Sequence, residues 1–175
     1  MKKVLFIFAI INILTYINLS AQNKWEIISQ GVFNKFQNCT FLTSNKCFVV
    51  DDSQYIYSSE DGGRNWSKTS LDTADRYASI SFSDSLNGWV VADKIYRTTD
   101  CGKNWFDTYC DIQNCRGYIY SLNDTLTYLL AYERLYVTTD QGKRWTSLIP
   151  GNNYSYCLAF SVDSKDIAWA LEEIT

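Results

Sequence analysis

The chain has 175 residues, a formal net charge of −3 and 16% aromatic residues, but it contains no histidine. Without histidine, Ser-His-Asp and Cys-His catalytic arrangements are excluded. The chain also lacks a C-x-x-C pair, so we expect neither a bound metal nor a cofactor. The net negative charge disfavours nucleic acid and anionic membranes as main partners.

Residues 1–21 have the pattern of a secretory signal peptide. Two lysines precede an apolar run from Val4 to Ile17, and the segment ends in small residues at Ala21. We expect cleavage after Ala21 and a secreted or periplasmic domain over residues 22–175. Membrane contact is expected only through an uncleaved signal segment. Because the cleavage point carries no cysteine, a bacterial lipoprotein is not expected.

The rest of the chain repeats short, alternating strand patterns about every 40 residues. The segment Trp25–Ser29 aligns with the segments that begin at Trp66, Trp105 and Trp145 in the later repeats. First strands are expected to end at Phe41, Phe82, Leu122 and Phe160. Apolar second strands are expected at 47–50, 88–91, 128–131 and 167–170. Third strands are expected at 55–57, 94–97 and 134–137, and no long amphipathic helix is present.

One motif, S/T-x-D-x-G-x-x-W, occurs at residues 59–66, 98–105 and 138–145, with tryptophans 39 and 40 residues apart. A hydroxyl and a carboxylate two residues apart can cap free backbone N–H groups in a tight turn. The glycine permits a positive φ, and the tryptophan buries apolar surface. We therefore expect structural roles for Ser59, Asp61, Gly63, Trp66, Thr98, Asp100, Gly102, Trp105, Thr138, Asp140, Gly142 and Trp145.

The motif resembles the Asp-box (BNR) repeat of β-propellers. The run from Ile80 to Asp100 is similar to the repeat of photosystem II stability/assembly-factor-like secreted propellers. The resemblance implies an all-β fold of four-stranded antiparallel blades, with box hairpins on the face opposite the binding site. Closed propellers need about four to eight blades. We therefore expect a partial propeller, with three blades and part of a fourth, and we favour a sequence that is incomplete at Thr175. The alternative is an open arc of blades that needs a partner to cover its edges.

All six cysteines lie in the part of the chain that we expect to be exported. An oxidising compartment permits disulfides, although sequence alone does not choose the pairing. Cys39 and Cys47 should lie on adjacent antiparallel strands, and Cys110 and Cys115 bracket one loop between blades. We therefore expect the disulfides Cys39–Cys47 and Cys110–Cys115, while the other two cysteines stay unassigned.

Three cationic residues, Lys35, Arg76 and Arg116, each stand six residues before the expected end of a first strand. Each lies beside or near an aromatic residue: Phe36, Tyr77 and Tyr118. Such cations would line the mouth of a central channel and bind carboxylates. The alternative is that they are ordinary exposed loop charges, since the fourth unit has Tyr154 at this place. We expect a non-catalytic protein-binding or assembly module whose partner is another protein or an acidic peptide.

The competing function is a secreted glycoside hydrolase of the sialidase type, because sialidases also carry Asp-boxes. Sialidases use an arginine cluster, a tyrosine nucleophile and an aspartate acid. The candidates here are Arg76 and Arg116, one of Tyr77, Tyr109 and Tyr118, and one of Asp72, Asp75 and Asp111. No order of residues selects among them, and the carboxylate pair of glycoside hydrolysis cannot be located. We therefore favour the binding module over the enzyme.

Overall fold

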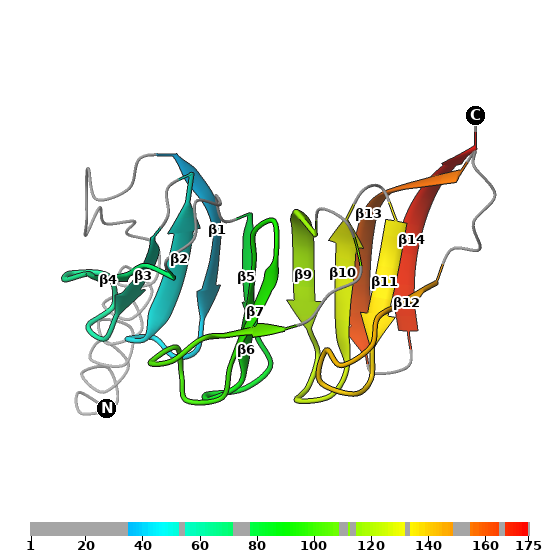
Figure 1. Ribbon diagram of the computed structural model, residues 1–175. Coiled ribbons are helices and arrows are strands. Elements are labelled where there is room, and N and C mark those ends of the chain that lie inside the picture. The colour runs from blue at the N-terminus through cyan, green and yellow to red at the C-terminus, as the bar shows by residue number, and fades with distance from the viewer. Residues whose placement is uncertain are drawn as a thin grey trace, which may run out of the picture. The chain divides into compact units, whose positions relative to one another are not determined.

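The computed structural model describes residues 35–52, 55–71, 78–108, 112, 115–131 and 134–148, together with the backbone of 155–164 and 167–174. The chain divides into two compact units, Met1–Gln30 and Gly31–Thr175, and every described residue belongs to the second. The described elements are all strands (Figure 1). Within these residues, no helix is long and apolar enough to cross a membrane. The expected signal peptide lies outside them.

Three four-stranded antiparallel sheets follow one another along the chain, and we call them blades 1 to 3. Blade 1 consists of β1 (Phe36–Phe41), β2 (Cys47–Asp51), β3 (Ile56–Ser59) and β4 (Ser67–Thr69). Blade 2 consists of β5 (Ser79–Phe82), β6 (Gly88–Val91), β7 (Ile95–Thr98) and β8 (Phe106–Thr108). Blade 3 consists of β9 (Gly117–Ser121), β10 (Thr127–Ala131), β11 (Arg134–Thr138) and β12 (Thr146–Ser147).

A two-stranded antiparallel sheet follows, made of β13 (Ser155–Ser164) and β14 (Ile167–Ile174). In every blade each strand pairs with the next one along the chain. The predicted all-β propeller architecture, with four-stranded antiparallel blades and a partial fourth, is confirmed. The second strands are mostly apolar because both faces of β2, β6 and β10 are buried.

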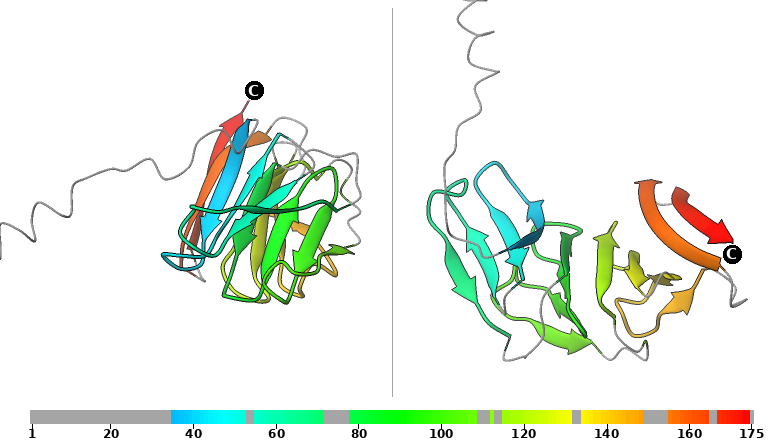
Figure 2. Two further views of the ribbon diagram at one scale, coloured as in Figure 1. Left: turned by 90° about the vertical axis from the view of Figure 1, so that its left-hand side faces the viewer. Right: turned by 90° about the horizontal axis from the view of Figure 1, so that it is seen from above.

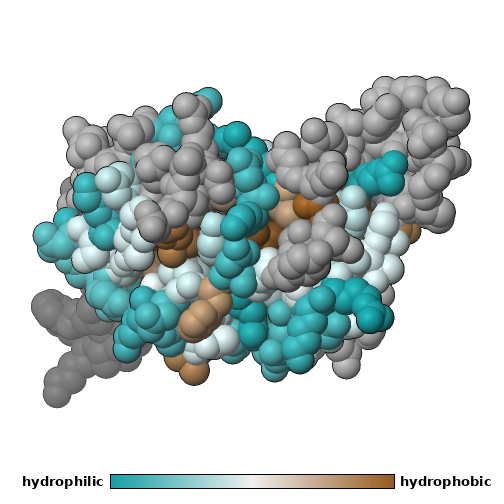
Figure 3. Space-filling model, viewed as in Figure 1, coloured by the Kyte–Doolittle hydropathy of each residue, from teal (hydrophilic) through white to brown (hydrophobic). Residues whose placement is uncertain are grey.

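The hydrophobic core lies between the blades. One cluster joins Phe48, Val50 and Ile56 of blade 1 to Ile80, Val90, Ala92 and Tyr96 of blade 2. A second joins Trp89, Val91 and Ile95 of blade 2 to Cys115, Ile119, Leu129, Ala131 and Trp145 of blade 3. Side chains alternate along a strand, so β6 sends Val90 toward blade 1 and Trp89 toward blade 3. In Figure 3, hydrophobic side chains accordingly show between the blades.

The first strands, β1, β5 and β9, lie next to one another, and we call them the inner strands (Figure 2). Short polar side chains link them. Asn38 Oδ1 accepts the Ile80 N–H at 3.3 Å. Ser79 Oγ accepts the Ile119 N–H at 3.2 Å, and Ser81 Oγ accepts the Ser121 N–H at 3.0 Å. These bonds give the buried backbone groups of one blade a partner on the next.

Candidate functional site

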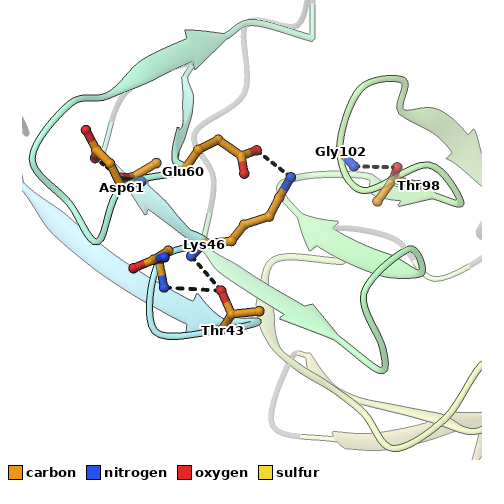
Figure 4. Close-up of polar contacts among 8 residues, drawn as sticks. Thr43, Lys46, Glu60, Asp61, Thr98 and Gly102 are labelled. Atoms are coloured by element: carbon orange, nitrogen blue, oxygen red, sulfur yellow. Dashed lines mark hydrogen bonds and ion pairs between the residues drawn. The ribbon is translucent and has the colours of Figure 1, made fainter.

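Each Asp-box is closed by the same pair of side-chain contacts. The Ser59 hydroxyl donates to Asp61 Oδ1 at 2.9 Å and accepts the Gly63 N–H at 2.8 Å. The hydroxyls of Thr98 and Thr138 make the same two contacts in the other boxes, each at 2.9 Å. Figure 4 shows the Thr98 bond to Gly102. In each turn, the hydroxyl therefore links the box carboxylate to the N–H of the box glycine.

The box carboxylates cap the second half of each turn. Asp61 Oδ1 accepts the backbone N–H of Asn65 at 2.9 Å, and Asp61 Oδ2 accepts the Asn65 side-chain amide at 2.6 Å. Asp100 holds Asn104 in the same way. In the third box, Asp140 accepts the backbone N–H of Arg144 at 2.9 Å.

The turns between the first two strands lie beside the box turns, at the lower end of the blades in Figure 1. The Gly62 N–H donates to the carbonyl of Asn45 at 2.8 Å, and the Cys101 N–H donates to that of Leu86 at 2.9 Å. In blade 1, the ammonium of Lys46 also pairs with Glu60 (Figure 4). We call this end of the blades the box end.

The residue before each box glycine is in the left-handed backbone region. Its φ is 72° at Gly62, 62° at Cys101 and 64° at Gln141. A residue with a side chain pays about 1–2 kcal/mol for this conformation. Cys101 and Gln141 therefore take the place of Gly62 without changing the conformation of the turn.

The box glycines of blades 2 and 3 pack on an aromatic ring of the preceding blade. A Cβ on Gly102 would lie 2.8 Å from the Phe48 ring, and one on Gly142 would lie 2.7 Å from the Trp89 ring. In the second contact, Trp145 meets Trp89 edge to face, with ring centroids 6.0 Å apart. The box turns therefore hold neighbouring blades together.

Arg97 also crosses between blades 2 and 3, and sequence reasoning did not single it out. Its Nη1 donates to Gln141 Oε1 at 3.2 Å, and its guanidinium carbon lies 5.4 Å from the centre of the Trp89 ring. Burial lowers the pKa of Arg97 from its ordinary value. The contact could not be predicted from the strand pattern around Arg97, because its partner Gln141 is 44 residues away in the sequence.

The box carboxylates predict a loss of stability in acid. The backbone N–H of Asn65, followed by its side-chain amide, lowers the pKa of Asp61 from 3.8 to about 2. The pKa values of Asp100 and Asp140 are also lowered, mainly by the N–H groups of Asn104 and Arg144. A folded-state pKa below the unfolded value means that the stabilisation is present above pH 3.8 and is lost as the pH falls toward about 2.

Urea unfolding between pH 5 and pH 2 should therefore show a falling free energy of unfolding below about pH 4. Asp61→Asn should make this fall shallower, because one carboxylate with a lowered pKa no longer titrates. The control is Asp93→Asn, which removes an exposed carboxylate outside the boxes. If Asp61→Asn and wild type have parallel pH profiles, the box carboxylate does not contribute to stability in this way.

The structure does not show the expected Cys39–Cys47 disulfide, and both thiols are free. Strand pairing sets Cys39 opposite Val49 and Cys47 opposite Phe41, so the two cysteines are diagonal neighbours. Diagonal Cα atoms lie about 7–8 Å apart, beyond the usual disulfide span of about 4.4–6.8 Å. Burial raises the pKa of both thiols. Cys110 lies outside the described residues, so the Cys110–Cys115 pairing stays a prediction.

Two of the three predicted cationic residues, Lys35 and Arg116, are described, and both are exposed at the end of the blades opposite the box end. The Lys35 carbonyl accepts the N–H of Asp52, just beyond β2, at 2.8 Å. Arg116 directly precedes β9, whose first residue Gly117 pairs with the last residue of β10. Tyr118 is 61% exposed. The other predicted binding residues, Arg76 and Tyr77, lie outside the described residues.

Gly117 fixes the position of Arg116 and Tyr118 against the sheet. A Cβ at Gly117 would lie 1.8 Å from the carbonyl oxygen of Leu130 on β10. No side chain fits there without moving backbone, so glycine lets β9 begin close against β10. Tyr120, two residues beyond Tyr118, was not predicted as a binding residue from the sequence, although it is 41% exposed. The alternation Arg-x-Tyr-x-Tyr was the available signal for it.

The glycosidase candidates are mostly not described. Arg116 and Tyr118 are, whereas Tyr109, Asp72, Asp75 and Asp111 lie outside the described residues, as do Arg76 and Tyr77. Across the part of the chain that the structure describes, no group of three or more His, Cys, Asp or Glu residues is placed to hold a metal ion. Of the glycosidase candidates, the described pair Arg116 and Tyr118 is exposed.

A family model described as photosynthesis system II assembly factor YCF48 matches residues 17–153. The photosystem II assembly lipoprotein Ycf48 of Synechococcus sp. (strain CC9902) is 26% identical over 105 residues, which are 57% of this chain and 31% of that protein. A structure of YCF48 bound to D1 peptide is 25% identical with a TM-score of 0.63, covering 72% of this chain and 43% of that one. This chain thus spans less than half the length of either relative.

A GH74 enzyme of Niastella koreensis is also similar in structure, with a TM-score of 0.54 and 17% identity, covering 65% of this chain and 17% of that one. A likeness at this level of identity shows the fold alone, because one fold carries many functions.

Proposed function

Because this chain belongs to the photosynthesis system II assembly factor YCF48 family, we propose that it is an exported, non-catalytic propeller module that binds another protein or a peptide. The observation that carries the proposal is the exposure of Lys35 and Arg116 beside inner strands, at the end opposite the box end. The relative that is bound to D1 peptide supports a peptide ligand.

The proposed site combines Lys35, Arg76 and Arg116 with the aromatic residues Tyr77 and Tyr118. A guanidinium group offers its donors as a planar fork that matches a carboxylate. The partner should therefore present carboxylates, either as an acidic segment or as a free C-terminus. In the cell, such a module would serve the assembly of an exported or envelope complex.

Export of the module rests on residues 1–21, which we propose to be removed after Ala21 to leave the domain 22–175. Removing two lysines takes the formal charge from −3 to −5, so the cationic site would stand out on an acidic protein. The Synechococcus relative is named a lipoprotein, which supports export. Mass spectrometry of the protein recovered from the periplasm or medium tests the cleavage point.

Arg116→Ala should weaken binding of an acidic peptide about tenfold, because one charge-assisted hydrogen bond is worth about 1.5–3 kcal/mol. Lys35→Ala should weaken it less, since an ammonium makes no bidentate contact. Both effects should shrink as salt rises, because exposed charges are screened. Isothermal titration calorimetry at two salt concentrations measures these changes.

The matched control is Lys143→Ala, which removes an exposed cation at the box end. It should leave the affinity unchanged. Equal losses for Arg116→Ala and Lys143→Ala would mean that only the net charge attracts the peptide. In that case the end opposite the boxes is not the binding site.

A further inference from the structure

The inner strands differ in what they present to the following blade. Ser79 and Ser81 face blade 3 and accept its backbone N–H groups. These serines pair with Val91 and Trp89 of β6. In blade 3 the corresponding pairs are Tyr118 with Leu130 and Tyr120 with Tyr128. Blade 3 therefore carries two tyrosines where blade 2 carries two serines.

The exchange of serine for tyrosine changes the exposure of these positions. Ser79 and Ser81 are 2% and 9% exposed, whereas Tyr118 and Tyr120 are 61% and 41% exposed. A tyrosine hydroxyl stands a full ring beyond Cβ, so it cannot accept a backbone N–H at the short reach of a serine. Side chains of β1 and β5 accept backbone N–H groups of the next inner strand. Tyr118 and Tyr120 of β9 are too long to make the same kind of bond. β13 contacts β10 and β11.

Arg116, Tyr118 and Tyr120 form one row, because every second residue of an extended chain points to the same side. Successive members of the row are about 6.5–7 Å apart, at the rise of about 3.2–3.4 Å per residue. All three side chains are exposed. Two aromatic faces in line with a guanidinium have the same spacing as the side chains on one face of an extended peptide.

We propose that this row binds an extended peptide segment of the partner, with a carboxylate on Arg116 and alternate apolar side chains on Tyr118 and Tyr120. The inference rests on the proposed function and adds the shape and residue pattern of the ligand. Tyrosine suits such a contact because it offers a large, rigid apolar face with a polar tip. A carboxylate at one end sets the direction and register of the peptide.

The test uses two synthetic six-residue peptides of identical composition, with blocked ends. One has aspartate first and leucines at the third and fifth positions, with serine elsewhere. The other has aspartate first and leucines at the third and fourth positions. Each is also made in the reverse direction, so that strand polarity does not decide the result. The alternating peptide in the better direction should bind about tenfold more tightly, because only it can bury both leucines on the tyrosines.

The variant Tyr118→Ser/Tyr120→Ser places the blade 2 residues in blade 3 and should abolish the difference between the two peptides. The control Phe106→Ser removes a 57% exposed aromatic side chain from β8 and should retain it. Far-UV circular dichroism verifies that each variant is folded. A wild type that binds both peptides equally, or a difference that survives the double serine variant, overturns the inference alone. A wild type that binds neither peptide overturns the proposed function and the inference together.

Discussion

Replacing Trp89 with alanine should lower the free energy of unfolding by about 3–5 kcal/mol. Trp89 is completely buried between blades 2 and 3. Its ring meets Trp145 edge to face at 77° and carries the Arg97 guanidinium above it. Alanine would remove all of these contacts and leave a cavity that the two sheets cannot close. Urea unfolding followed by circular dichroism measures the loss.

The variant Trp89→Phe keeps an aromatic ring at this position but removes the indole N–H group. The Trp89 Nε1 atom is buried without a hydrogen-bond partner in the described structure, so the loss of this donor should cost nothing. Phe106→Ala, at a 57% exposed position, is the surface control and should change stability by less than about 0.5 kcal/mol. A Trp89→Ala variant as stable as the Phe106→Ala variant would show that this interface does not support the fold.

Gly142→Ala should destabilise the protein by about 2–5 kcal/mol, for two additive reasons. Gly142 has a φ of 82°, a conformation that costs other residues about 1–2 kcal/mol. In addition, a Cβ would lie 2.7 Å from the Trp89 ring, and such overpacking costs about 1–3 kcal/mol. Thermal and urea unfolding of the variant measure the sum.

Gly62→Ala is the matched control for this prediction. Its φ is 72°, but the nearest atom to an added Cβ is a carbonyl oxygen at 3.3 Å. The equivalent positions already hold Cys101 and Gln141 in the same conformation. Gly62→Ala should therefore cost only the conformational part, about 1–2 kcal/mol. Equal losses for Gly62→Ala and Gly142→Ala would contradict the close packing of the box on Trp89.

The repeating features of the fold could be predicted because each is local in sequence. The spacing of Ser59, Asp61 and Gly63 predicts a turn capped by a hydroxyl and a carboxylate, and the structure shows these capping bonds. The second strands could be predicted because they are buried on both faces and so are mostly apolar. A period of about 40 residues then implied a series of similar sheets.

The features that the sequence left open depend on register and on contacts between blades. A shift of two residues in pairing turns Cys39 and Cys47 from opposed to diagonal neighbours. The bond from the Ile119 N–H to Ser79 spans 40 residues and has no local pattern. Whether Tyr120 is buried or exposed depends on the next strand, which a sequence period does not place. The sequence pointed to Lys35 and Arg116 as candidate binding residues, and that role stays a prediction.

Because each hydrophobic cluster is shared by two neighbouring blades, one sequence repeat does not coincide with one cooperative folding unit. One repeat contributes Val90 to the cluster on one side and Trp89 to the cluster on the other. A single repeat on its own would therefore expose two half-cores and could not fold. Stability then grows with the number of contacts between adjacent repeats, as in a one-dimensional nearest-neighbour system. Deleting a middle repeat would remove two such contacts and re-form one between mismatched neighbours, whereas duplicating a repeat adds a complete core in one step.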